Sequence, residues 1–215
     1  MEANIGKLEL GLRHPTTKGF SMTVAAVARP LISLTLPRDR SGRLAMQVLA
    51  AVAGSVLLAL SAKVTVPFWP VPMTLQVLAV FLIGAAYGRN LAVATLLLYL
   101  AEGAAGLPVF ATGAGLAYMA GPTGGYLAGF VVAAAIAGWA ADRGMDRNPL
   151  KLFAAMLVGE LVILGFGAAW LSVLFGAEKA IAFGVGPFIV TDIVKVALAA
   201  AIVPAAWGLL ARFRA

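Results

Sequence analysis

Long apolar segments alternate with short polar clusters over most of the chain. Charged residues make up only 12% of the sequence, and they gather between the apolar segments. Membrane-spanning helices have this pattern because the hydrocarbon core of a bilayer excludes charged groups. The pattern predicts an all-α membrane protein with one domain of six transmembrane helices. The predicted spans are residues 44–62, 74–88, 91–107, 125–141, 152–175 and 187–211.

The segments outside these spans are polar or basic. Residues 1–43 are expected to form a cytoplasmic extension, in which residues 19–36 either lie in the membrane interface or are poorly ordered. Residues 212–215 form a short cytoplasmic tail. The span at 74–88 is short for a hydrocarbon core of about 30 Å, so either its loop enters the membrane or the bilayer thins there.

The overall composition supports a membrane protein. Hydrophobic residues make up 62% of the 215 positions, and the mean hydropathy is +0.97. A net charge of +7 would suggest nucleic acid as a partner of a soluble protein. Here the basic residues flank apolar spans, so membrane orientation explains them and no nucleic-acid partner is expected.

The positions of lysine and arginine predict the orientation. Thirteen of the sixteen basic residues fall on one side of the six-span arrangement, which places both termini in the cytoplasm and the chain in the cell's inner membrane. Lys63 and Lys179 fall in the opposite loops, and Lys195 lies within the last span. The thirteen are Lys7, Arg13, Lys18, Arg29, Arg38, Arg40, Arg43, Arg89, Arg143, Arg147, Lys151, Arg212 and Arg214.

Several kinds of chemistry are excluded or made improbable by residue counts. There is no cysteine, which excludes disulfides and thiolate chemistry, and the one histidine, His14, lies in the polar extension. We therefore expect no metal site and no cofactor. An intramembrane enzyme that uses Glu102 or Asp192 as a base remains a rival hypothesis, but no serine and histidine pair supports it.

Two outer loops have compositions suited to a site. The first, KVTVPFWPVPMT, surrounds Phe68 and Trp69 with three prolines, which forbid a continuous helix. The second, GLPVFATGAGLAYMAGPTGGY, is rich in glycine, so it can fold close to a ligand or to neighbouring helices. For each loop taken alone, an interfacial loop that carries an aromatic anchor is the favoured explanation.

Asp192 and Lys195 are two charges inside the last apolar span. Their spacing of three places both on one face of a helix, within about two turns of the outer surface. Intramembrane charges commonly mark ligand paths, although a structural ion pair between helices would also explain them. Glu102 lies level with the pair and is a candidate for the same cavity, whereas Glu160 is expected to form a hydrogen bond in helix packing.

A face of small residues marks the first span. Ala50 and Gly54 stand four apart, at the spacing that permits close helix contact. Internal packing is the default explanation for such a face, and docking of a partner subunit is the alternative.

The order of motifs resembles a known family. VPMTLQVLAV, GLPVF, GPTGGYL and GPFIVTDIVK resemble, in sequence order, the BioY family, the biotin-specific substrate-binding (S) components of energy-coupling factor (ECF) transporters. The resemblance covers about residues 44–211 and leaves out the extension before Arg43. It implies a six-helix protein that captures biotin at the outer face and works with a transmembrane coupling subunit and two ATP-binding-cassette ATPases. The sequence accordingly has no P-loop pattern.

The resemblance also implies roles for residues. Asp192 and Lys195 would hold the ureido end of biotin, and chemistry alone equally allows Lys195 to meet the valerate carboxylate. Aromatic residues would cover the apolar ring: Phe68, Trp69, Phe110 and Tyr118. Family members offer an amide in the glycine loop where this chain has Ala114, and Thr112 is a substitute hydrogen-bonding group. Ala50 and Gly54 would meet the coupling subunit. An S component for another small vitamin is the closest alternative.

Overall fold

The structure is a computed structural model that describes residues 30–212. The predictions for residues 1–29, which include the larger part of the basic extension and of the interfacial stretch, lie outside the described residues. The last three residues of the tail do so as well.

Helices make up most of the described chain. Six of them match the predicted spans: α1 (Arg40–Lys63), α2 (Gln76–Tyr87), α3 (Arg89–Ala104), α5 (Gly124–Asp142), α6 (Pro149–Phe175) and α8 (Gly186–Arg212). The shorter elements were not predicted: η1 (Leu31–Leu34), β1 (Thr65–Val66), β2 (Met73–Thr74), α4 (Gly115–Met119), η2 (Met145–Arg147) and α7 (Ala177–Gly184).

Local signals explain where the main helices begin and end. The Asp39 side chain accepts a hydrogen bond from the Gly42 amide and caps α1, and Asn148 caps α6 in front of Pro149 at the first helical position. Gly88 and Gly176 adopt positive φ values of 76° and 90°. This conformation suits glycine and separates α2 from α3 and α6 from α7.

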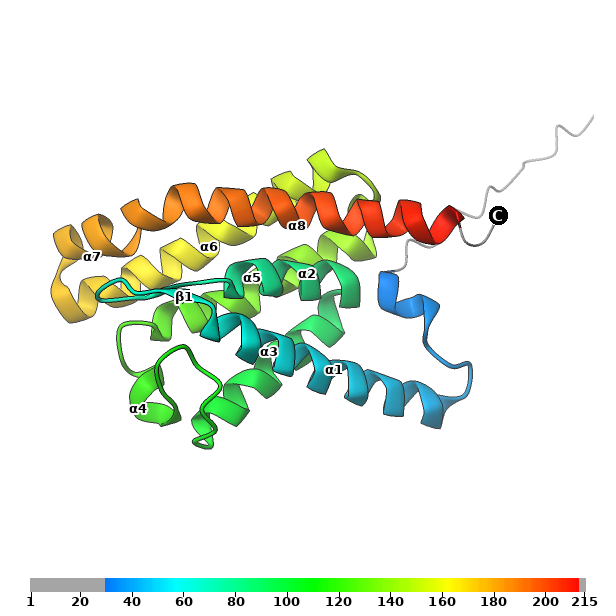
Figure 1. Cartoon of the computed structure of the whole chain (residues 1–215), viewed down its shortest axis with the longest axis horizontal. Coiled ribbons are helices and arrows are strands. Elements are labelled where there is room, and N and C mark those ends of the chain that lie inside the picture. Colours follow the sequence, from blue (N-terminus) through cyan, green and yellow to red (C-terminus); the bar gives the residue numbers. More distant parts are fainter. Residues whose placement is uncertain (1–29, 213–215) are drawn as a thin grey trace, which may run out of the picture.

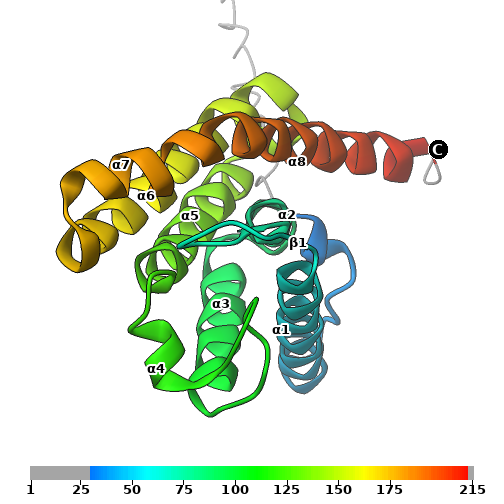
Figure 2. The same cartoon turned by 60° about the vertical axis from the view of Figure 1, so that its left-hand side comes forward.

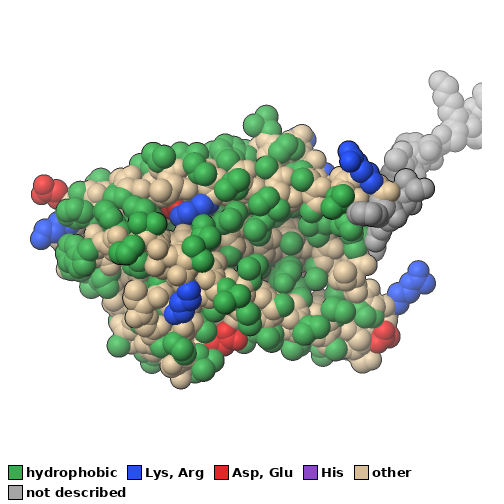
Figure 3. All heavy atoms as spheres, viewed as in Figure 1, with side chains coloured by type: hydrophobic (Ala, Val, Ile, Leu, Met, Phe, Trp, Pro, Cys, Tyr) green, Lys and Arg blue, Asp and Glu red, His purple; other side chains and the backbone are tan. Residues whose placement is uncertain are grey.

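Four described helices are long and apolar enough to cross a membrane: α1, α5, α6 and α8. With its 12 residues, α2 is shorter than a complete span would be. Figure 3 shows hydrophobic side chains spread over one face of the molecule, with few charged groups among them. The chain is a multi-pass membrane protein.

The connections between helices gather at two ends of the bundle (Figure 1). At one end, the Asp142 side chain accepts from the Arg89 amide, and η2 packs against α8. The opposite end carries the β1–β2 hairpin, α4 and α7, where Trp69 lies against Phe175. Figure 2 shows α1 and α3 side by side, with α6 and α8 on the other side of the molecule.

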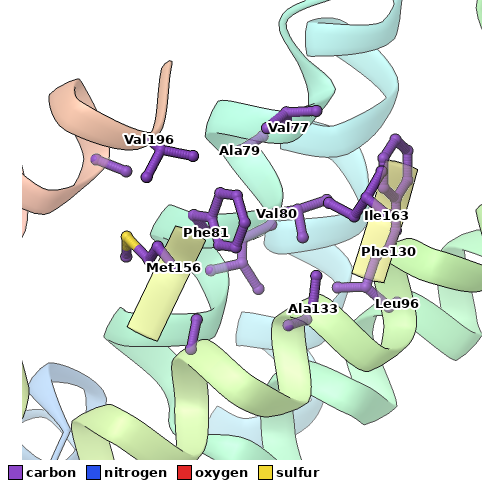
Figure 4. Close-up of a cluster of buried hydrophobic side chains, with 14 of the residues drawn as sticks. Val77, Ala79, Val80, Phe81, Leu96, Phe130, Ala133, Met156, Ile163 and Val196 are labelled. Atoms are coloured by element: carbon purple, nitrogen blue, oxygen red, sulfur yellow. The ribbon is translucent and has the colours of Figure 1, made fainter. Parts of the chain in front are cut away.

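The core lies where α2 meets α5, α6 and α8. Side chains from all four helices meet in Figure 4, among them Val80, Phe81, Phe130, Ala133, Met156, Ile163 and Val196. Small residues bring the helices close together. A Cβ atom at Gly159 would lie 2.8 Å from the Phe81 ring, and one at Gly138 would lie 2.5 Å from the Arg89 backbone nitrogen. This packing fixes the walls from which the candidate site is built.

Candidate functional site

Asp192 and Lys195 form an ion pair near the amino-terminal end of α8. The Lys195 Nζ donates to Asp192 Oδ1 at 2.5 Å, and Asp192 is only 1% exposed. Pro187 stands in the first turn of the helix, where its missing amide hydrogen costs nothing. The predicted shared face is confirmed, and its two charges neutralise each other inside an apolar bundle.

The pair borders a cavity between the helices and the loops that carry the β1–β2 hairpin and α4. Its walls are mostly apolar, with a few polar groups, which is the composition of a small-molecule site. The lining residues are Val71, Pro72, Thr74, Gln76, Val77, Phe110, Ala111, Tyr118, Thr123, Tyr126, Leu127, Phe130, Ile163, Phe188, Asp192 and Lys195.

A polar network supports one wall of the cavity. The Gln76 amide nitrogen donates to the Tyr99 hydroxyl at 2.9 Å, and this hydroxyl donates to the Val109 carbonyl at 3.0 Å. The Thr74 hydroxyl donates to Gln76 Oε1 at 3.3 Å. The network therefore ties the β2 strand and the start of α2 to the glycine-rich loop after α3.

Aromatic rings form the remainder of the wall. Phe110 stacks on Tyr118 with the ring centroids 5.0 Å apart, and Tyr126 lies 5.9 Å from Phe188. The Phe110 carbonyl accepts from Lys63 Nζ at 2.5 Å. A bond of 2.6 Å to the Gly184 carbonyl fixes the Tyr126 hydroxyl. The rings are thus held by contacts with α1 and α7 around an open space.

Four predicted site residues line this cavity: Asp192, Lys195, Phe110 and Tyr118. The two aromatic residues of the first loop lie elsewhere. Phe68 is half-buried behind Phe188, edge to face at 6.5 Å. Trp69 is 67% exposed and lies against Phe175 and Phe183, so it does not cover the cavity.

The predictions for the glycine loop and for Glu102 also differ from the structure. Thr112 is exposed, Ala114 is the residue before α4, and neither lines the cavity. The Glu102 carboxylate accepts a hydrogen bond from Ser55, so it joins α3 to α1 instead of facing Asp192 and Lys195. The Glu102 side chain lies on the face of α3 that packs against α1. Its predicted depth in the membrane did not indicate which face it occupies.

The docking prediction for Ala50 and Gly54 is wrong. Both residues are buried inside the bundle, and the Tyr87 hydroxyl donates to the Ala50 carbonyl at 2.9 Å. A Cβ atom at Gly54 would lie 2.6 Å from the Thr95 methyl carbon. The small face serves contact with α2 and α3, which was the default explanation.

Several cavity residues were missed by the sequence analysis. Thr74, Gln76, Tyr126 and Phe188 line it, and each stands in one of the family motifs, although none of them was predicted as a site residue. A glutamine at the start of an apolar run was the clearest available signal, because buried amides need partners. Glu160 is buried and has no hydrogen-bond partner among the described residues, contrary to expectation.

The arrangement is suited to binding a small amphipathic molecule. A carboxylate that accepts hydrogen bonds and an ammonium that donates them stand at one wall, and aromatic rings cover the others. No group of three acidic, histidine or cysteine side chains that could hold a metal occurs within residues 30–212. The polar groups would orient a ligand, and the apolar walls would exclude water from it.

Comparison with known proteins identifies the family. A model of the BioY family matches residues 24–212. The match begins well before residue 44, so the resemblance extends further toward the amino terminus than the motifs indicated. In the described part of that stretch, Leu31 of η1 packs against the hydrophobic core.

Curated relatives and a solved structure agree with this match. The chain is 42% identical over 144 residues to a probable biotin transporter BioY of Pyrococcus horikoshii, covering 66% of this chain and 85% of that protein. It is 38% identical over 162 residues to the biotin transporter BioY of Thermotoga maritima. This alignment covers 73% of this chain and 92% of that protein. A crystal structure of the S-component for biotin from an ECF-type ABC transporter shares the fold, with a TM-score of 0.67 and 20% sequence identity. The match covers 80% of this chain and 95% of that chain.

Proposed function

The chain belongs to the BioY family, and from this premise we propose that it takes up biotin as the substrate-specific component of an ECF-type transporter. Relatives described as biotin transporters support the substrate. The proposed role is binding and transport, without chemical change of the ligand.

The observation that carries the proposal is the cavity bordered by Asp192 and Lys195. Biotin has a flat ureido head with two N–H groups and one carbonyl, an apolar thioether ring and a valerate tail. Asp192 can accept from a ureido N–H, while Lys195 can donate to the ureido carbonyl or to the valerate. Phe110, Tyr118 and Tyr126 would cover the apolar ring. These groups suit the ligand in kind, because they combine an acceptor and a donor with apolar rings.

The energy for uptake would come from other subunits. We propose a transmembrane coupling subunit and two ATP-binding-cassette ATPases as partners, because the chain has no nucleotide-binding P-loop pattern of its own. The coupling contact would use a surface other than Ala50 and Gly54, since these residues are covered by α2 and α3.

We also propose six spans with both termini in the cytoplasm. The asymmetry of thirteen basic residues out of sixteen supports this orientation. The native chain has no cysteine, so single cysteines can be introduced without a background signal. A cysteine replacing Lys179 should react with an impermeant reagent from outside, and one replacing Arg147 only from inside. The reverse labelling would reject the orientation.

Identification of the bound molecule tests the function. The protein, purified from cells grown with a mixture of vitamins, should retain biotin and release it on denaturation. Mass spectrometry of the released material identifies it, and titration with biotin then gives the affinity. Another vitamin in place of biotin would refute the substrate assignment but retain a vitamin-binding role. Biotin release from the wild type but not from Asp192→Ala would tie the ligand to the cavity.

A further inference from the structure

Gln76 places an uncharged amide in the wall of the cavity. It stands at the start of α2, is 5% exposed, and lines the same cavity as Asp192 and Lys195. Helix α2 packs against α8, which carries that ion pair. An amide group has an accepting side and a donating side, so its orientation decides which hydrogen bonds it can offer to a ligand.

The Tyr99 hydroxyl fixes the orientation of this amide. A tyrosine hydroxyl has a single hydrogen, and the Val109 carbonyl, 3.0 Å away, can only accept it. The Gln76 atom that lies 2.9 Å from the same hydroxyl is therefore the amide nitrogen, which donates. Tyr99 is 0% exposed and is not among the lining residues, so a ligand in the cavity does not compete for either bond.

Thr74 holds the other side of the amide. Its hydroxyl accepts a hydrogen bond from the Gln76 backbone nitrogen at 3.2 Å and donates to Gln76 Oε1 at 3.3 Å. The donors thus follow one direction, from Thr74 through Gln76 and Tyr99 to the Val109 carbonyl. A turned amide would set Oε1 against Tyr99, whose hydrogen is already bound to Val109, so one buried acceptor would lose its hydrogen bond.

Gln76 Oε1 has capacity for a second hydrogen bond. A carbonyl oxygen has two lone pairs, and among the described residues Thr74 is its one donor. The ureido head of biotin has two N–H groups, and Asp192 can accept from one of them. An uncharged acceptor suits the other N–H, because it leaves the charges of Asp192 and Lys195 balanced.

We propose that Tyr99 is a positioning residue of the biotin site, which holds the Gln76 amide so that Gln76 Oε1 accepts a hydrogen bond from a ureido N–H. Tyr99 acts through Gln76 and does not touch the ligand. This inference rests on the proposed function, because it assigns Gln76 a contact with biotin.

The test is a double-mutant cycle of Tyr99→Phe and Gln76→Met. Tyr99→Phe removes the hydroxyl and keeps the ring, which packs edge to face on Phe110 at 5.5 Å. Biotin titration on folded, monodisperse protein measures the affinity of each variant. Each single variant should bind biotin about tenfold more weakly than the wild type. The double variant should bind like Gln76→Met alone, because without the amide nothing remains to be positioned.

The cycle separates this role from a purely structural one. Tyr99 also bonds to the Val109 carbonyl in the glycine-rich loop, so loss of the hydroxyl would loosen that loop as well. In that case Tyr99→Phe would weaken binding by the same factor in the wild type and in Gln76→Met. Equal factors in the two backgrounds overturn the inference. Wild-type affinity in Tyr99→Phe or in Gln76→Met also overturns it.

Tyr87→Phe is the matched control. It makes the same chemical change at the other end of α2, where the Tyr87 hydroxyl donates to the Ala50 carbonyl at 2.9 Å. This variant should melt at a lower temperature and bind biotin like the wild type. A tenfold loss of affinity in Tyr87→Phe would show that loss of any such hydroxyl weakens binding, and would overturn the special role of Tyr99.

A second measurement observes the amide without biotin. The chain has two glutamines, Gln47 and Gln76, so labelling with ¹⁵N-glutamine gives two side-chain signals, which Gln47→Ala assigns. The Gln76 side-chain hydrogens should exchange slowly with water in the wild type and in Tyr87→Phe, and faster in Tyr99→Phe. Unchanged exchange in Tyr99→Phe overturns the positioning role. If the wild type binds no biotin, the proposed function fails, and this exchange still decides whether Tyr99 holds the amide.

Discussion

Two buried aspartates near opposite ends of α8 have contrasting surroundings. Asp192 lies in the helix, pairs with Lys195 and borders a cavity. Asp146 lies in η2, is 0% exposed, and accepts a hydrogen bond of 2.5 Å from the indole nitrogen of Trp207 near the other end of α8. The first is next to space that a ligand can fill, and the second is enclosed by the protein.

The contrast separates a binding site from a structural contact. Burial and a hydrogen bond from another side chain are common to both aspartates, so neither property alone identifies a ligand site. The cavity and the converging groups from other elements distinguish Asp192. At Asp146 the Arg147 guanidinium lies over the Trp207 ring at 4.8 Å, and this contact fastens η2 to α8.

Breaking the Asp192–Lys195 ion pair should have the largest effect. Lys195→Met leaves Asp192 buried without its cation, which should destabilise the protein by about 3–5 kcal/mol and weaken biotin binding. Thermal unfolding in detergent and biotin titration measure the two effects. Lys179→Met, at an exposed position of α7, is the matched control and should change neither. Equal melting temperatures for both variants would contradict the account of the pair.

Breaking the contact between Asp146 and Trp207 should have a smaller effect, confined to stability. Asp146→Ala leaves the Trp207 N–H without its acceptor and should cost about 1–3 kcal/mol. Asp146→Asn keeps an acceptor and should cost less. Both variants should bind biotin like the wild type when folded, and reduced affinity in either would place Asp146 in the binding machinery.

The burial of Asp146 also predicts that the stability of the fold depends on pH. Burial raises the pKa of the Asp146 carboxyl above its ordinary value, so the folded protein binds a proton more readily than the unfolded chain. This contribution to stability is present at low pH and is lost as the pH rises through the folded-state pKa. Asp146→Asn should remove it, which unfolding at several pH values would detect as a flatter profile.

The smallest effect is expected at an exposed aspartate. Hydrogen bonds from the Gly42 amide and from Ser41 lower the pKa of Asp39, the cap of α1. The contribution of Asp39 to folding stability is therefore present above its pKa in the unfolded chain. It is lost as the pH falls through its pKa in the folded protein. Asp39→Ala should lower the melting temperature slightly and leave biotin affinity unchanged. A large loss of affinity would show that exposed and buried aspartates cannot be separated as proposed.

The sequence predicted the long helices well because apolar length and the charged clusters between them determine their positions. It did not predict α4 and α7, since elements of 5 and 8 residues carry little periodic pattern. The sequence also did not predict whether Ala50 and Gly54 face the interior of the bundle or its surface. A face of small residues suits packing inside the bundle and docking of a partner equally well, so the sequence does not decide between the two.

At the site, the sequence identified the charges but not the uncharged groups. Asp192 and Lys195 stood out because ionised side chains are rare in apolar spans. Gln76 and Tyr126 carry no charge, and their place in the cavity wall depends on contacts with Tyr99 and Gly184, which are distant in sequence. The prediction for Trp69 was wrong because the composition of its loop suggested an aromatic cover over the ligand. In the structure, Trp69 lies against Phe175 instead.

The most direct test of the central claim compares one substitution at the two buried aspartates. Asp192→Asn and Asp146→Asn make the same chemical change, and isothermal titration with biotin is performed on folded, monodisperse protein. We expect Asp192→Asn to weaken binding by at least about 1–3 kcal/mol, because a ligand N–H loses a charged acceptor. Asp146→Asn should bind with wild-type affinity. Unchanged affinity in Asp192→Asn would contradict the ligand role of the pair and leave it as an ion pair within α8 that has only a structural role.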